Sequence, residues 1–198
     1  MAVIKKFRIK NFKEQETLLQ LDKISMFYDK RRILNDISFK VNRSEVLGLL
    51  GPNGVGKSTI FKIIMNIEQP KSGKILLNGI DCTNFPIHER SSKFHLSYCP
   101  QYGGYFYDLT VLENLTAVAE IHIKEKNLRI SKIDKIVGQF GFDSILNVKA
   151  IHLSGGEKRK LAIGMAIIND PEILLLDEPY AALDILSIKM IQEIIINL

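Results

Sequence analysis

The stretch VLGLLGPNGVGKST, residues 46–59, places a glycine-rich loop between an apolar run and a helical pattern. VLGLL, residues 46–50, is a short continuous apolar run of the kind that is buried on both faces of a sheet. Residues 59–67 continue with helical periodicity. A strand, a glycine loop and a helix in this order indicate an α/β fold.

The loop from Gly51 to Ser58 matches the pattern G-x-x-x-x-G-K-[ST]. Its glycines let backbone amides approach phosphate oxygens, and the dipole of the following helix favours an anion there. We expect Lys57 to reach the β- and γ-phosphates and the Ser58 hydroxyl to ligate Mg²⁺. This predicts a nucleotide site, but the loop alone distinguishes neither ATP from GTP nor a kinase from a GTPase or a motor.

Two acids, Asp177 and Glu178, follow the apolar run ILLL at residues 173–176. Carboxylates at the C-terminal end of a buried parallel strand lie where α/β sheets bind ligands. We expect Asp177 to hold Mg²⁺, directly or through water, and Glu178 to orient and deprotonate the attacking water. Gln101 follows a short strand at residues 96–99 and could contact the metal or the water at the same edge, although glutamine in a turn is commonplace.

The segment LSGGEKRK, residues 153–160, puts Ser154 and two glycines directly ahead of a helical pattern at residues 157–168. Ser154 fits an ordinary N-cap. The glycines lower helix propensity but expose amides at a helix N-terminus, which fits an anion site. The two interpretations are compatible. The charged run from Lys158 to Lys160 is expected to form the solvated face of the helix.

Composition is that of a globular protein of 198 residues, with 46% hydrophobic and 25% charged residues. No apolar run approaches the roughly 18 residues of a membrane span, and no secretory signal is evident. Cys82 and Cys99 match no metal spacing and suggest a reducing compartment, so we expect a cytosolic location. The net charge is +5, and much of the excess lies near the N-terminus. Nucleic acid and anionic lipid are both possible partners there, but a solvated, mobile tail is the expectation.

The remaining elements follow from periodicity. Strands are expected at residues 19–27, 37–41 and 74–80. Helices are expected at residues 110–123, 130–140 and 185–198. The last helix should present one apolar face made of Ile188, Ile191, Ile195 and Leu198.

The phosphate loop, Gln101, LSGGE (153–157) and LLLDEP (174–179) occur in this order, and with them the chain strongly resembles the ATP-binding cassette (ABC) ATPases. The resemblance covers about residues 19–198. It implies an α/β fold with a P-loop NTPase (RecA-like) core, an antiparallel β subdomain and a helical insertion. The implied divisions are a basic extension at 1–18, an ATP-binding core at 19–104 and 153–198, and a helical subdomain at 105–152.

The resemblance also implies roles for particular residues. In the family, two cassettes pack head to tail, and each ATP lies between the phosphate loop of one and the signature segment of the other. The implied ATP contacts are Asn53, Gly54, Gly56, Lys57, Ser58 and Thr59, with Ser154, Gly155, Gly156 and Glu157 as the signature. Asp177 is the implied metal position, with Ser58 and Gln101, while Glu178 and Gln101 are the implied catalytic pair. Asp184 falls in the loop between subunits at 181–184, and Tyr28, or its neighbour Phe27, falls where an aromatic ring stacks on adenine.

Within the family, three stretches resemble the ATPases of lipopolysaccharide exporters, namely residues 85–101, 108–118 and 177–195. This implies a homodimer beneath inner-membrane permease subunits, on the cytoplasmic face. A helix of each permease is then expected to dock in a groove near Tyr102–Tyr107, although these rings could equally anchor the helical insertion to the core. The ATPases of branched-chain amino-acid importers are the alternative, and they often carry glutamate in place of Gln101. A nucleic-acid-associated cassette is a further alternative, but no direct nucleic-acid contact is expected.

ABC ATPases carry a switch histidine on a further strand beyond the acid pair. The sequence reaches Leu198 without it. We therefore expect a C-terminally incomplete cassette that, as given, hydrolyses ATP slowly or not at all.

Overall fold

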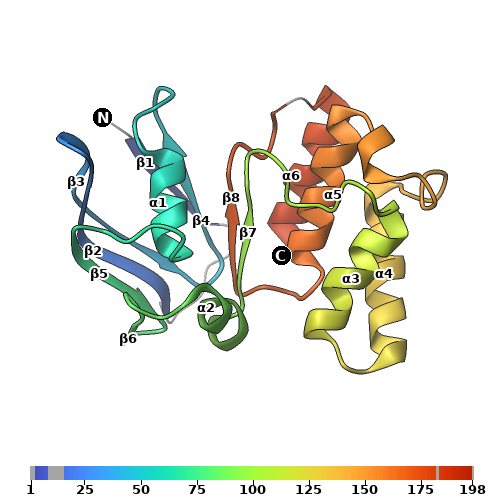
Figure 1. Ribbon diagram of the computed structural model, residues 1–198, viewed down its shortest axis with the longest axis horizontal. Helices are drawn as coiled ribbons and strands as arrows, with labels where there is room; N and C mark the ends of the chain where they lie inside the picture. Colours follow the sequence, from blue (N-terminus) through green and yellow to red (C-terminus); the bar gives the residue numbers. More distant parts are fainter. Residues whose placement is uncertain (1–2, 9–15, 182, 198) are drawn as a thin grey trace. The chain divides into compact units, whose positions relative to one another are not determined.

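The computed structural model describes residues 3–8, 16–181 and 183–197. The chain forms two compact units, residues 1–96 and 97–198 (Figure 1). Within these described ranges, no helix has the length and apolar character needed to cross a membrane.

Four antiparallel strands form the main sheet of the first unit, in the order β3-β2-β5-β6. They are β2 (Thr17–Tyr28), β3 (Arg31–Asn42), β5 (Ser72–Leu77) and β6 (Ile80–Asp81). The strands expected at 19–27, 37–41 and 74–80 are thus confirmed, and the first two are longer than predicted. Leu19, Leu21 and Ile24 of β2 are buried against the core. The antiparallel β part of the fold follows from the alternation of apolar and polar side chains along β2.

A separate two-stranded sheet joins β1 (Val3–Arg8) to β4 (Glu45–Leu50) in antiparallel register, with Val3 opposite Leu50. The mobile tail expected at the N-terminus is therefore wrong for β1, while Lys10 and Lys13 of the basic patch lie outside the described residues. The expectation that residues 46–50 are buried on both faces is also wrong. They are half-buried or exposed, because an antiparallel pair can leave one face open to water.

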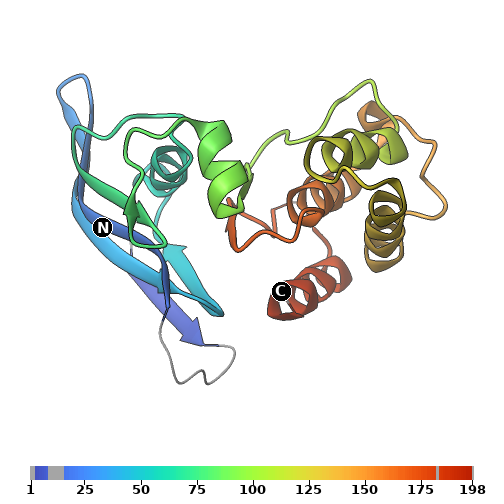
Figure 2. The same ribbon diagram turned by 90° about the horizontal axis from the view of Figure 1, so that it is seen from below.

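Helix α1 (Lys57–Ile64) follows β4 and the phosphate loop, and it buries Ile60 and Ile63. The helix predicted at 59–67 therefore exists, but it begins and ends earlier. Its C-terminal carbonyls, from Ile63 and Ile64, accept hydrogen bonds from the wholly buried Arg90 of α2 (Ile87–Phe94). Such a bond satisfies carbonyls that lack a partner within the helix. The views from two sides place α1 beside the four-stranded sheet (Figure 2).

The second unit contains a two-stranded sheet and four α-helices. Its elements are β7 (Leu96–Cys99), α3 (Val111–His122), α4 (Lys126–Phe140), the 3₁₀ turn η1 (Ala150–His152), α5 (Gly155–Ile167), β8 (Ile173–Leu176) and α6 (Ile185–Asn197). The amide of Asp177 donates to the carbonyl of Cys99 at 3.0 Å, so the C-terminal ends of β7 and β8 lie together. This is the arrangement predicted for the acid pair and Gln101.

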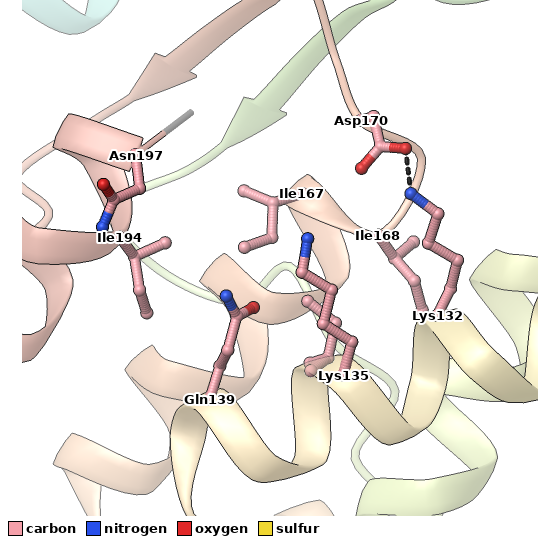
Figure 3. A pocket seen from close by; sticks show the side chains of 9 residues that line it. Lys132, Lys135, Gln139, Ile167, Ile168, Asp170, Ile194 and Asn197 are labelled. Atoms are coloured by element: carbon pink, nitrogen blue, oxygen red, sulfur yellow. Dashed lines mark hydrogen bonds and ion pairs between the residues drawn. The ribbon is translucent and has the colours of Figure 1, made fainter.

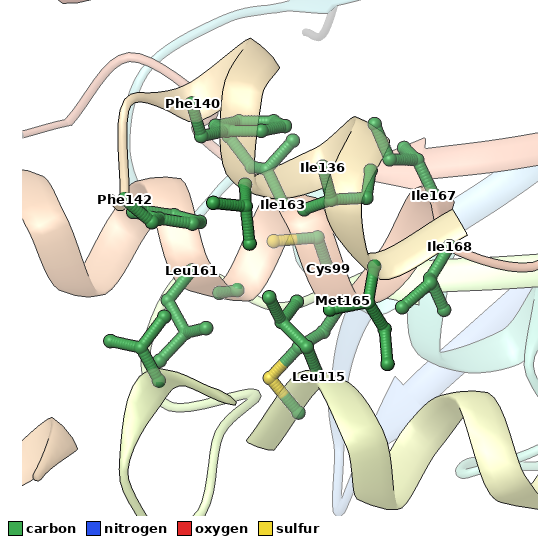
Figure 4. Packing of buried hydrophobic residues seen from close by; sticks show 14 of the residues in the cluster. Cys99, Leu115, Ile136, Phe140, Phe142, Leu161, Ile163, Met165, Ile167 and Ile168 are labelled. Atoms are coloured by element: carbon green, nitrogen blue, oxygen red, sulfur yellow. The ribbon is translucent and has the colours of Figure 1, made fainter. Parts of the chain in front are cut away.

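One hydrophobic cluster joins all four helices of this unit (Figure 4). The rings of Phe140 and Phe142 stack with centroids 5.6 Å apart beside α5, which is buried on nearly all sides. The expected apolar face of α6 is only partly correct. Ile191 is buried, but its buried neighbours are Ser187 and Ile194, because isoleucines on several sides of α6 leave its spacing ambiguous. Ile188 and Ile195 are half-buried, and Leu198 lies outside the described residues.

Candidate functional site

The phosphate loop has the backbone that its glycines allow. Gly54 and Gly56 have φ angles of 76° and 102°, a region that side chains rarely adopt. A Cβ atom at Gly56 would lie 2.8 Å from Cδ2 of Leu34, so this position also lacks the space for a side chain. Gly56 is the N-cap of α1, whose first turn carries no acidic residue. The loop therefore ends at an uncompensated helix N-terminus, which favours an anion.

The ammonium group of Lys57 folds back over this loop. Its Nζ atom donates to the carbonyl oxygens of Gly51 at 2.8 Å and Pro52 at 2.9 Å. Ser58 is half-buried and Thr59 is buried at the start of α1, while Asn53 is exposed in the loop. The residues predicted to hold phosphate thus lie together in the loop and the first turn of α1.

Tyr28 and Phe27 are the two predicted candidates for the ring that stacks on adenine, and their surroundings in the structure differ. The Tyr28 hydroxyl donates to the Glu68 carboxylate and also contacts Thr59 at the start of α1. Burial of its hydroxyl and the bond to Glu68 raise the pKa of Tyr28 above its ordinary value of 10. The Phe27 ring instead lies under the Arg32 guanidinium, 5.1 Å from ring centroid to Cζ. These contacts favour Tyr28 as the ring beside the phosphate loop.

In the second unit, the ends of β7 and β8 bring three predicted residues together. Nε2 of Gln101 donates to Oε2 of Glu178 at 2.7 Å. Asp177 is buried, with 3% of its surface exposed, and the Tyr98 hydroxyl lies 3.5 Å from its Oδ2 atom. Burial, followed by the charge of Asp177, raises the pKa of Tyr98 to about 12. Tyr98 is therefore a protonated neighbour of Asp177 at neutral pH, a contact that the sequence did not reveal.

Glu178 has a left-handed backbone, with φ at 51°. This conformation is uncommon for residues other than glycine and costs roughly 1–3 kcal/mol, which the surrounding contacts must offset. Strain of this kind is concentrated at sites where a side chain must be aimed. At Glu178 it accompanies a carboxylate that contacts Gln101, although eight other described non-glycine residues share this backbone conformation.

Arg159 corrects a prediction, because the run from Lys158 to Lys160 is not a solvated face. Arg159 is 6% exposed and donates to the carbonyls of Pro100 and Asp177, both at 2.5 Å, and of Pro179 at 3.4 Å. The helical register could have indicated that Arg159 is buried, since it lies three and four residues before the buried Ala162 and Ile163 of α5. Its neighbours in the run are half-buried.

The signature segment begins α5 with a reciprocal capping box. Oγ of Ser154 accepts from the Glu157 amide at 3.3 Å, and the Glu157 carboxylate accepts from the Ser154 amide at 2.7 Å. These bonds hold the pKa of Glu157 below its ordinary value of 4.5, with the side chain of Ser154 as the first cause. Between them lie the amides of Gly155 and Gly156, in the first turn, where a helix offers no acceptor. The N-cap interpretation is confirmed, and it leaves two amides for an anion.

The remaining predicted site residues are Asp184 and those of the loop at 102–107. The Asp184 carboxylate accepts from the amide and hydroxyl of Ser187 at 2.9 and 2.7 Å, which caps α6; Ala182 lies outside the described residues. Tyr102 is 83% exposed, whereas Tyr105 packs against the core cluster. Phe106 and Tyr107 are also exposed, so the loop carries both rings open to solvent and one ring that anchors it to the core.

A residue that sequence reasoning missed shapes this loop. Asn114 of α3 is fully buried and its amide group donates to the carbonyls of Phe106, Leu109 and Thr110, while its oxygen accepts from the Phe106 amide. It lies in the stretch DLTVLENLTAV, where a buried amide among apolar neighbours was the available signal. Asn114 fixes the backbone beside the exposed rings.

A small hollow elsewhere in the second unit takes none of the predicted residues. It lies between α4, the end of α5 and α6, with Lys132 paired to Asp170 at its rim and Ile194 and Gln139 along its wall (Figure 3). None of the residues that line it belongs to a motif singled out in the sequence.

The residues present fit a magnesium nucleotide. Glycines in left-handed conformations, an open helix N-terminus and Lys57 suit a triphosphate, and hydroxyl and carboxylate oxygens suit Mg²⁺. Among the described residues no cluster of three or more His, Cys, Asp or Glu could hold a metal ion. Mg²⁺ tolerates such a sparse protein site, because it keeps waters and takes phosphate oxygens. Ser58 lies in the first unit and Asp177 in the second.

The sequence profile of a known family, described as ABC transporter, matches residues 34–181. The chain belongs to the ABC transporter family. It is similar to an uncharacterized ABC transporter ATP-binding protein of Rhizobium meliloti, with 40% identity over 86% of this chain and 63% of that protein. It is similar to the lipopolysaccharide export system ATP-binding protein LptB of Haemophilus influenzae, with 37% identity over 92% of this chain and 76% of that protein.

ABC proteins of other named specificity are as similar. The molybdate/tungstate import ATP-binding protein WtpC of Pyrococcus abyssi is 37% identical over 85% of this chain and 47% of that protein. A solved ATP-binding subunit of an ABC transporter matches with a TM-score of 0.77 and 28% identity, over 89% of this chain and 72% of that one. The chain thus spans less than two thirds of some curated ABC relatives. The expected ABC ATP-binding fold is confirmed.

Proposed function

We propose that this ABC ATP-binding chain hydrolyses ATP to drive transport across a membrane. The observation that carries the proposal is the contact between Gln101 and Glu178 at 2.7 Å, next to the buried Asp177. A carboxylate in a fixed direction beside an amide is suited to orient a water molecule and accept its proton. The same pair at the ends of two neighbouring strands lies where α/β sheets bind ligands.

In this proposal the phosphate loop binds ATP. Its amides and Lys57 would hold the phosphates of ATP, and Tyr28 would stack on the base. Ser58 in the first unit, and Asp177 with Gln101 in the second, are the residues that would ligate Mg²⁺. The bound Mg²⁺ neutralises charge on the phosphates. Residues 19–104 and 153–198 act as the ATP-binding core, and residues 105–152 as the helical subdomain.

The chain acts as a homodimer in this proposal. One chain has one phosphate loop, so the amides of Gly155 and Gly156 serve the ATP of the partner chain. Asp184 lies in the loop between the two subunits. Because Tyr102 is exposed beside a backbone pinned by Asn114, the loop at 102–107 receives a permease helix at the cytoplasmic face of the membrane.

Lipopolysaccharide export is the transport reaction that we favour. LptB of Haemophilus influenzae matches 92% of this chain, and the resemblance extends over residues 85–101, 108–118 and 177–195. An importer is the second candidate, favoured by the similarity to a molybdate/tungstate import protein at the same 37% identity. No direct contact with nucleic acid is part of either reaction.

The test of hydrolysis is Glu178→Gln in the full-length protein. We expect ATP turnover to fall by at least about 100-fold while the Kd for ATP stays within about twofold, because only the proton acceptor is removed. Lys71→Met, at an exposed position outside the site, is the control. Full turnover in Glu178→Gln contradicts hydrolytic function as we assign it. Stimulation of the permease complex by lipopolysaccharide, and not by molybdate, then separates export from import.

A further inference from the structure

We infer that Arg159 is a positioning residue that holds Glu178 and Gln101 in their working geometry and ties both to the signature helix. The inference rests on the proposed hydrolytic function. It concerns a side chain that donates hydrogen bonds to three backbone carbonyls of the second unit.

The carbonyls that Arg159 contacts flank the two catalytic residues. Pro100 directly precedes Gln101, and Asp177 and Pro179 stand on either side of Glu178. The planar guanidinium spans all three, because its donors form a fixed fork. A single side chain therefore restrains the backbone at both ends of the Gln101–Glu178 contact.

The backbone of Glu178 requires such a restraint. Its φ of 51° is a strained conformation, and strain persists where surrounding bonds over-determine it. Arg159 bonds the carbonyl before Glu178 at 2.5 Å and the carbonyl after it at 3.4 Å. Without these bonds the peptide can relax, and the carboxylate turns away from Gln101.

Arg159 also connects this geometry to the signature segment. It lies four residues, about one helical turn, after Gly155 on the same helix. The loop that follows Gln101 packs on that helix as well, since a Cβ at Gly104 would lie 3.3 Å from Pro100 and 3.5 Å from Ala162. A displacement of the first turn of α5, where the partner's ATP is proposed to bind, would therefore move the backbone of Gln101 and Glu178.

Removing the charged side chain of Arg159 is expected to cost stability. Arg159 is 6% exposed; of the three carbonyls that it contacts, that of Asp177 belongs to a buried residue and those of Pro100 and Pro179 to half-buried ones. Truncating one partner of a buried hydrogen bond leaves the other without a partner.

The test compares Arg159→Met with Lys160→Met, the adjacent half-buried lysine, in the full-length protein. We expect Arg159→Met to lower kcat by at least about tenfold with the Kd for ATP within about twofold, and Lys160→Met to change neither by more than about twofold. A weakened Kd with an unchanged kcat in Arg159→Met overturns the inference.

A double-mutant cycle with Glu178→Gln separates positioning from a general loss of structure. Because Arg159 acts through Glu178, adding Arg159→Met to Glu178→Gln should leave the residual single-turnover rate unchanged. If the residual rate falls by the same factor as in the wild-type background, Arg159 does not act through Glu178. If Arg159→Met does not fold, Arg159→Lys keeps the charge but loses the fork, and the same loss of kcat and the same non-additivity are expected. Wild-type kcat in Arg159→Lys overturns the inference.

The two proposals fail separately. Full turnover in Glu178→Gln contradicts the hydrolytic function itself. Loss of turnover in Glu178→Gln together with wild-type behaviour of Arg159→Met contradicts only the positioning role.

Discussion

The side-chain amide of Gln101 donates to the carboxylate of Glu178 at 2.7 Å, across the ends of β7 and β8. The two residues are 77 positions apart in the sequence. The neutral amide of Gln101 holds the Glu178 carboxylate without adding a charge beside it, and this leads to the first prediction.

Gln101→Glu should place two carboxylates against each other. Like charges at this distance disfavour double ionisation, so one of the two pKa values rises and one acid holds a proton. We expect turnover at neutral pH to fall by at least about tenfold, while ATP binding is kept. Steady-state turnover and ATP titration measure this. Gln101→Met, which removes the contact without adding charge, is the control, and the account fails here if Gln101→Glu is the more active of the two at neutral pH.

Lys57→Met should weaken ATP binding, because it removes the positive charge that reaches the phosphates. We expect the Kd for ATP to rise by at least about tenfold, or about 1.4 kcal/mol. Calorimetric titration with ATP and Mg²⁺ measures the change. Lys71→Met is the matched control, since Lys71 is an exposed lysine of the same unit. Equal affinities in the two variants would remove Lys57 from the site.

Gly56→Ala should destabilise the phosphate loop more than Gly79→Ala destabilises its turn. Both glycines have positive φ angles, 102° and 76°, but only at Gly56 would the new Cβ meet a side chain, Cδ2 of Leu34 at 2.8 Å. We expect Gly56→Ala to lower the free energy of unfolding by about 1–3 kcal/mol and Gly79→Ala by less. Denaturant unfolding compares them. Loss of ATP binding should accompany only the first, and an unaffected Gly56→Ala would contradict the loop geometry.

Ser154→Ala should raise the pKa of Glu157 toward its ordinary value of 4.5, since the Ser154 side chain is the first cause of its depression. A depressed carboxyl pKa stabilises the fold above pH 4.5, and this stabilisation is lost as the pH falls through the folded-state pKa. The variant should therefore lose stability less steeply on acidification. An NMR titration of the Glu157 carboxyl measures the shift, and an unchanged pKa would count against the capping box.

Thr110→Ala is the matched control for Ser154→Ala. Thr110 and Glu113 form the other capping box, at the start of α3, with the same pair of reciprocal bonds. Each alanine should cost about 1 kcal/mol of stability. Only Ser154→Ala should also abolish ATP turnover, because only that helix start is proposed to contact ATP. Equal turnover in the two variants would make Ser154 a structural cap alone.

Most of the elements were predictable from the sequence, because their signals are local. The phosphate loop, the strand at 96–99 and the N-cap at Ser154 each depend on residues within a few positions of one another. The grouping of Gln101 with Asp177 and Glu178 also followed, since parallel strands end at one edge of a sheet. The half-buried state of β4 did not follow, because it depends on which strand pairs with it.

The burial of Arg159 could not be predicted from the charged run alone. A lysine and arginine run resembles a solvated face, and only packing reveals that one member points inward to carbonyls distant in the sequence. The left-handed backbone of Glu178 and the hydroxyl of Tyr98 near Asp177 were equally invisible, because both depend on tertiary contacts. The choice between the two aromatic side chains that could stack on adenine also depends on a tertiary contact, because the Phe27 ring lies under Arg32.

The central claim is that ATP lies between the phosphate loop of one chain and the signature segment of another. Sedimentation of Glu178→Gln with ATP and Mg²⁺, with the bound nucleotide counted, tests it most directly. We predict a dimer that holds two ATP molecules, and, on adding Gly155→Asp, a monomer that still binds ATP with a Kd within about twofold. A Glu178→Gln/Gly155→Asp protein that dimerises as well as Glu178→Gln would contradict the claim.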